Sequence, residues 1–141
     1  MVDRFARTAP DGVKVLVVTD YTPGDLPYID GLVGRLSVDD VPRCRHLRRG
    51  LGRGFVYACE GAGRCLDCHM SYEAAERARG RSAGGAGAFC QCCRVPVEPA
   101  LLRPVVVEVG AWSILSALSP ACAVVLLDRG GRSAPSSGGV R

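Results

Sequence analysis

The sequence predicts an α+β fold, in which a small sheet carries an inserted, zinc-stabilised, ribbon-like module rich in cysteine and histidine. Two observations support this prediction. Short runs rich in valine and leucine lie near both ends of the chain and are typical of strands. Seven of the eight cysteines and both histidines lie between these runs, from Cys44 to Cys93. A chain of 141 residues suits one small domain with such an insertion.

The N-terminal part is expected to comprise a flexible leader, residues 1–12, and a strand–helix segment, residues 13–43. The run VKVLVVT at 13–19 is apolar and β-branched, which indicates a buried strand. Across residues 26–36 the apolar side chains recur at helical spacing, so we expect a short amphipathic helix there. The first strand and this helix would lie on the N-terminal side of the inserted module.

Residues 44–93 form the predicted metal-binding module. Within it, the segment SYEAAERARG at 71–80 carries the signals of a helix. Ser71 can cap its start, two glutamates precede two arginines in the order that suits the helix dipole, and Gly80 can end it. We therefore expect one helix inside the module.

Residues 94–128 are the most apolar part of the chain, and two interpretations compete. Residues 110–127 are eighteen in number and carry no charge, which reaches the length of a membrane-spanning segment, so membrane association through 105–127 is one alternative. The preferred interpretation is a strand at 105–109, a helix at 111–118, a break at Pro120 and a strand at 123–127, because residue propensities change along the segment in that order. Residues 129–141 are rich in glycine and serine and are expected to be a disordered tail.

Charge and composition set broad limits. The net charge is +4, which permits an anionic partner without requiring one. Lys14 is the only lysine among 18 basic residues, so arginine richness reflects the composition of the whole chain and only clustering is informative. The N-terminus lacks the apolar run of a secretory signal, so we expect a cytoplasmic protein whose cysteines bind metal rather than form disulfides.

The spacing of the cysteines predicts a first zinc site. Cys65 and Cys68 form one Cys-x2-Cys pair, and Cys90 and Cys93 form a second pair, with 21 residues between the two pairs. A two-residue spacer lets both thiolates of a turn point at one ion, at about 2.3 Å from it. Two such pairs would complete a tetrahedron, and the intervening loop can vary because it does not touch the metal.

A second zinc site is predicted from the remaining cysteines and histidines, so the chain would hold one or two zinc ions. Its expected ligands are Cys44, His46, Cys59 and His69. An interleaved arrangement, with pairs exchanged between the two sites, stays open because sequence cannot decide which pairs meet. Cys92 is left over, and Cys122 is interpreted as a small buried hydrophobic residue.

Three other chemistries fit parts of the same pattern. The stretch GRCLDCHM contains Cys65-x-x-Cys68-His69, the attachment signature of c-type haem. Four thiolates also suit an iron–sulfur cluster, and either Cys-x-x-Cys pair could act as a redox dithiol. Zinc is preferred because further cysteines and a histidine crowd the module and no export signal accompanies the haem motif.

An arginine cluster adjoins the presumed metal site and suggests a nucleic-acid partner. Within eleven residues lie Arg43, Arg45, Arg48, Arg49 and Arg53. A metal-fixed loop would hold their guanidinium groups where they can meet phosphates. We therefore expect a non-enzymatic, zinc-binding, basic regulator or accessory factor that contacts nucleic acid. The alternative is a zinc-stapled protein–protein adaptor, and no catalytic constellation or small-molecule substrate is inferred.

Overall fold

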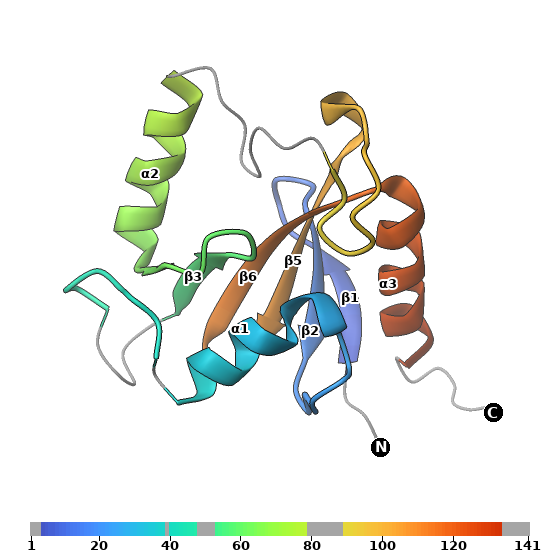
Figure 1. Ribbon diagram of the computed structural model, residues 1–141, viewed down its shortest axis with the longest axis horizontal. Coiled ribbons are helices and arrows are strands. Elements are labelled where there is room, and N and C mark those ends of the chain that lie inside the picture. The colour runs from blue at the N-terminus through green and yellow to red at the C-terminus, as the bar shows by residue number, and fades with distance from the viewer. Residues whose placement is uncertain (1–3, 39, 48–52, 79–88, 134–141) are drawn as a thin grey trace.

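The computed structural model describes residues 4–38, 40–47, 53–78 and 89–133 of the chain. This part contains one mixed six-stranded sheet and three α-helices, which confirms the α+β class (Figure 1). The zinc-ribbon module is supported only by clusters of cysteine and histidine, described below.

The sheet brings together segments that are far apart in the sequence. Its strands are β1 (Arg4–Thr8), β2 (Lys14–Val18), β3 (Gly54–Tyr57), β4 (Gly63–Arg64), β5 (Arg103–Val109) and β6 (Trp112–Leu118). Their spatial order is β1-β2-β5-β6-β3-β4. The β2–β5 and β6–β3 pairs are parallel, and the other pairs are antiparallel. The hairpin β5–β6 therefore forms the centre of the sheet and joins the N-terminal strands to β3 and β4.

Three helices surround this sheet. Helix α1 (Pro27–Ser37) crosses in front of it, and α3 (Pro120–Ser133) packs mainly against the β1 edge (Figure 1). Helix α2 (Leu66–Ala78) contacts β3 and β4 at the opposite edge. The main core lies where α1 and α3 meet one face of the sheet, and side chains such as Leu16, Ile29 and Ile114 are buried there. The two edges of the sheet thus carry different helices.

In the first half of the molecule, the strand and the helix expected after the leader are present, whereas the leader and the module helix differ from expectation. The strand expected at 13–19 is β2, and the helix expected at 26–36 is α1. The leader 1–12, expected to be flexible, instead contains β1, which pairs with β2. The module helix begins at Leu66 rather than Ser71, because the backbone N–H of Cys68 donates to the Cys65 sulfur at 3.4 Å. Cys65 thereby occupies the place of an N-cap side chain.

The predictions for the apolar segment are correct at its start and wrong beyond it. The strand expected at 105–109 lies in β5. The helix expected at 111–118 is wrong: Ala111 lies in a turn, and residues 112–118 form strand β6. Gly110, with φ of 59°, reverses the chain into a tight hairpin that pairs Val109 with Trp112. From Ile114 to Leu118, buried and half-buried side chains alternate, as expected for a strand whose successive side chains point to opposite faces of the sheet.

Residues 123–127 lie in helix α3 and do not form a strand. Pro120 begins this helix, where its fixed φ and missing N–H are well tolerated, and the Ser119 hydroxyl accepts the N–H of Cys122 at 3.2 Å. The pair Ser119–Pro120 is thus a helix start rather than a break. Helix α3 also continues to Ser133, into the segment expected to be a disordered tail. Among the described residues, no helix combines the length and apolar character needed to cross a bilayer.

Candidate metal centre

Four potential metal ligands converge at one edge of the sheet. The sulfurs of Cys44, Cys65 and Cys68 and a ring nitrogen of His46 all lie within 4.8 Å of one another. In a tetrahedral zinc site with Zn–S bonds of about 2.3 Å, the sulfurs would be about 3.8 Å apart. The four side chains are therefore close enough to take up one ion with small side-chain rotations.

Backbone hydrogen bonds hold Cys44 beside Cys65. The segment before Cys44 runs alongside β4, where Gly63 N–H donates to the Pro42 carbonyl at 2.7 Å. The N–H of Cys44 in turn donates to the Gly63 carbonyl at 3.1 Å. Because Cys65 directly follows β4, this pairing brings the two cysteines together, and the Cys65 N–H donates to the Cys44 sulfur at 3.3 Å.

The start of helix α2 supplies the other half of the first cluster. Cys65 caps the helix, and Cys68 lies in its first turn, so both sulfurs are near the positive end of the helix dipole. The Cys68 sulfur is 3.3 Å from His46 Nδ1. The Cys-x-x-Cys turn is thus joined to the 44–46 loop through both a sulfur–amide and a sulfur–imidazole contact.

The charge state of this cluster favours a cation. Burial opposes ionisation of Cys44, but hydrogen bonds from the Cys65 amide and from His46 outweigh it and lower the Cys44 pKa to about 6. The pKa of Cys68 is raised to about 11, chiefly by its side-chain hydrogen bond with Cys65, then by desolvation and the Cys44 sulfur. A divalent cation bound beside these sulfurs would favour the thiolate forms of both Cys44 and Cys68.

A second cluster contains three thiols. The sulfurs of Cys90, Cys93 and Cys122 lie within 4.8 Å of one another, without a fourth Cys, His, Asp or Glu in that group among the described residues. Cys90 is fully buried, Cys93 is exposed, and Cys122 lies half-buried in the first turn of α3. This cluster lies where β6 ends and α3 begins, because the 90–93 loop pairs with Ala117 and Cys122 follows Pro120.

A tight loop presents the Cys90–Cys93 pair to helix α3. The Arg94 N–H donates to the Cys90 carbonyl at 2.8 Å, and Arg94 has a positive φ of 68°. Gln91 exchanges two hydrogen bonds with Ala117 of β6, one through its N–H and one through its side-chain oxygen. Burial opposes ionisation of Cys90, yet hydrogen bonds from the Cys93 amide and from Ser119 lower its pKa to about 6.

The grouping differs from the one expected from spacing. Cys65 and Cys68 lie with Cys44 and His46, whereas Cys90 and Cys93 lie with Cys122. The two Cys-x-x-Cys pairs do not meet because β4 holds the first and β6 holds the second. The group of Cys65 and Cys68 with Cys44 and His46 corresponds to one of the interleaved pairings that the sequence left open, but the second group takes no further member from the predicted ligands. It includes Cys122, which spacing assigned to packing.

The other two expected ligands lie outside both clusters. His69 is buried, and its ring stacks on Phe55 with centroids 4.9 Å apart. Burial, followed by the charge of Arg64, lowers its pKa. Consecutive helical residues point about 100° apart, so His69 cannot share the direction of Cys68. Cys59 is exposed and joins neither group of potential ligands.

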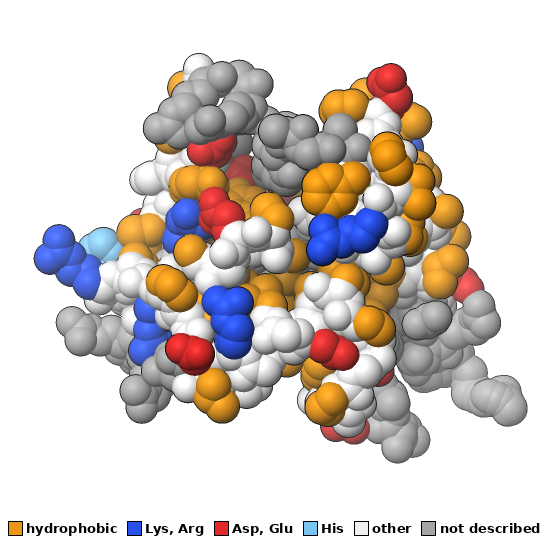
Figure 2. Space-filling view, in the orientation of Figure 1, with side chains coloured by type: hydrophobic (Ala, Val, Ile, Leu, Met, Phe, Trp, Pro, Cys, Tyr) orange, Lys and Arg blue, Asp and Glu red, His pale blue; other side chains and the backbone are white. Residues whose placement is uncertain are grey.

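The arginine cluster is divided by the fold. Arg53 donates to the Gly110 carbonyl at 3.2 Å and lies 3.4 Å from the Ser113 hydroxyl, so it braces the central hairpin. Arg43 is half-buried and Arg45 is exposed. Arg48 and Arg49 lie outside the described residues. Figure 2 shows basic side chains and a histidine projecting together at the edge where Figure 1 draws residues 40–47.

Comparison with protein-family models, with curated proteins and with solved structures finds no match to this chain. The geometry of the two clusters is therefore the basis for functional inference.

Proposed function

We propose that this chain is a zinc-binding protein whose ion is held by Cys44, His46, Cys65 and Cys68. The observation that carries the proposal is that all four ligand atoms lie within 4.8 Å of one another. Three thiolates and one imidazole are a common ligand set of structural zinc sites. Four protein ligands leave no open position on the ion, so its role here is to join the 44–46 loop to β4 and α2 rather than to catalyse a reaction.

The surroundings of the cluster support zinc over haem. Covalent haem attachment at Cys65 and Cys68 would need His69 as an iron ligand. His69 is instead stacked on Phe55 and buried. The N–H groups of Cys65 and Cys68 donate to the sulfurs of Cys44 and Cys65, and such hydrogen bonds hold ligand sulfurs in place and favour their thiolate form.

Elemental analysis of the purified chain tests this proposal. We expect Cys65→Ser to carry one zinc ion fewer per chain than the wild type, because it removes a ligand from a four-ligand site. Cys59→Ser is the matched control, since Cys59 belongs to neither cluster, and it should retain the wild-type zinc content. Equal zinc content in wild type and Cys65→Ser would overturn the proposal.

A second candidate function is contact with nucleic acid through the loop that the ion would fix. The specific observation is that Arg45 is exposed and lies in sequence between two proposed ligands, Cys44 and His46. A guanidinium held on such a loop is suited to bind phosphate oxygens. Arg53 adds little to this surface because its side chain contacts the central hairpin.

We expect Arg45→Ala to weaken binding to a single-stranded oligonucleotide several-fold. The slope of the logarithm of the affinity against the logarithm of the salt concentration should also become shallower by about one, as expected for the loss of one phosphate contact. Fluorescence anisotropy across a salt series measures both quantities. Arg103→Ala is the control, because it removes the same charge from an exposed position on β5. Failure of the wild type to bind at low salt would exclude this function and favour an adaptor role.

A further inference from the structure

The fold holds the three thiols of the second cluster close together, and none of them belongs to the proposed structural zinc centre. Its sulfurs come from two elements that the fold brings together, the 90–93 loop and the first turn of α3. The Cys90 thiol is fully buried and takes hydrogen bonds from the Cys92 and Cys93 amides and from Ser119. Donors that converge on a buried sulfur stabilise its thiolate form, the form that binds metal.

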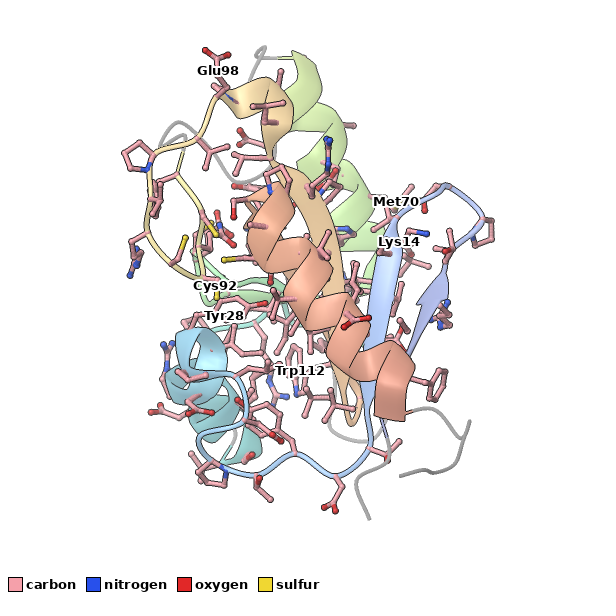
Figure 3. The ribbon with its side chains drawn as sticks, turned by 90° about the vertical axis from the view of Figure 1, so that its right-hand side faces the viewer. Lys14, Tyr28, Met70, Cys92, Glu98 and Trp112 are labelled. Carbon is pink, nitrogen blue, oxygen red and sulfur yellow. The ribbon has the colours of Figure 1, made fainter. Side chains whose placement is uncertain are left out.

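Through Cys122, the cluster adjoins an apolar pocket of about 310 Å³ between the start of α1 and helix α3. Cys122 of the cluster and its neighbour Cys92 both line this pocket, together with Tyr28, Leu118, Ala121 and Val125. Figure 3 shows Tyr28 and Cys92 next to each other beside α3. An ion bound to the Cys122 sulfur would therefore lie at the wall of a cavity that can admit a small molecule.

We propose that Cys90, Cys93 and Cys122 bind a second zinc ion, and that its fourth coordination position takes an exogenous thiol from the adjoining apolar pocket. Three protein ligands with one open position distinguish reactive zinc sites from closed structural ones. The described residues supply no fourth ligand atom within the group. The exogenous thiol would bind as its thiolate and release its proton to solvent.

The lining of the pocket favours a thiol whose remaining part is apolar over a ligand that carries a further charge. The described lining contains the carboxyl of Asp25 and no arginine or lysine. A carboxylate or phosphate group lying in the pocket would therefore find no compensating positive charge among these residues. A thiol with a short alkyl group instead offers a soft ligand atom to zinc and an apolar surface to Leu118 and Val125.

Zinc content separates this site from the first one. We expect two zinc ions per chain in the wild type, one in Cys122→Ser and one in Cys65→Ser, because each variant loses a different site. Cys92→Ser should keep both ions. Loss of an ion from Cys92→Ser would mean that four cysteines bind the second ion, and it would contradict the proposed open coordination position. An unchanged zinc content in Cys122→Ser would overturn the second site while leaving the first untouched.

The open position is tested with cobalt(II) in place of zinc. The difference spectrum between wild type and Cys122→Ser isolates the visible bands of the second site, and addition of 1-butanethiol should shift them saturably. Ala121→Trp, which fills the pocket, should retain the bands and lose the shift. Val124→Trp is the matched control, because Val124 lies on α3 outside the lining and is 66% exposed, and it should respond like the wild type. Absence of a shift in the wild type would contradict the proposal.

Discussion

Replacing Cys65 with serine is expected to lower the melting temperature of the zinc-loaded protein by roughly 8–16 °C. Cys65 contributes twice, because its sulfur is a proposed ligand and also caps helix α2. A ligand present at about a thousand times its dissociation constant stabilises the folded state by about 4 kcal/mol. For a chain of this size, each kcal/mol corresponds to about 2–4 °C. Differential scanning calorimetry at saturating zinc measures the shift.

Two comparisons show whether this loss comes from the metal. Cys59→Ser removes an exposed thiol outside both clusters and should melt within about 2 °C of the wild type, as most surface substitutions do. A strong chelator should lower the melting temperature of the wild type to about that of Cys65→Ser, or below it if the second ion is also removed. A wild type that melts at the same temperature with and without chelator would contradict a stabilising role for zinc.

Replacing Gly54 with valine is expected to destabilise the fold by about 3 kcal/mol. A Cβ atom at this position would lie 2.4 Å from Cζ3 of Trp112, and one at Gly63 would lie 2.8 Å from the same ring. The indole therefore covers the backbone of β3 and β4, and a side chain there must displace it, which is an overpacking cost. Valine is a better strand former than glycine, so the loss cannot come from backbone preference.

Urea unfolding of Gly54→Val measures this effect, and helix α1 provides its control. Gly31 lies in α1 on an exposed position, and a Cβ added there meets nothing within 4 Å. Gly31→Ala should therefore raise the free energy of unfolding by up to about 1 kcal/mol, through helix propensity alone. If Gly54→Val is as stable as the wild type, the close approach of Trp112 does not constrain this edge of the sheet.

The sequence predicts well those elements whose local pattern of apolar residues is enough to identify them. Strand β2 is a β-branched run, and in α1 the residues Ile29, Leu32, Val33 and Leu36 recur at helical spacing and are all buried. Strand β5 is equally easy to predict, because it contains a run of three valines. Each of these segments has one apolar face or a continuous apolar run, so its local pattern and its burial agree.

The apolar segment after β5 shows where local pattern is insufficient. Trp112, Leu115 and Leu118 fit helical spacing, yet the left-handed backbone at Gly110 turns this segment into the partner of β5. Pro120 is consistent with a break in the apolar run, but a serine followed by a proline is also a helix start. A helix that starts at Pro120 has Cys122 in its first turn, beside Cys90 and Cys93.

Spacing contains more information about which residues could bind a metal than about how they are grouped. Spacing indicates which thiols can share a turn, but the choice of partner depends on which strands hold the two turns. Backbone pairing with Gly63 places Cys44 beside Cys65, and pairing of Gln91 with Ala117 places Cys90 near α3. These contacts arise from the sheet order, which no local pattern contains.

X-ray absorption at the zinc edge tests the central claim most directly. The suitable sample is Cys122→Ser loaded with zinc, because this variant retains the complete first cluster. The account predicts a first shell of three sulfurs at about 2.3 Å and one nitrogen at about 2.0–2.1 Å, supplied by Cys44, Cys65, Cys68 and His46. A shell of oxygen and nitrogen alone, or of four sulfurs, would contradict it.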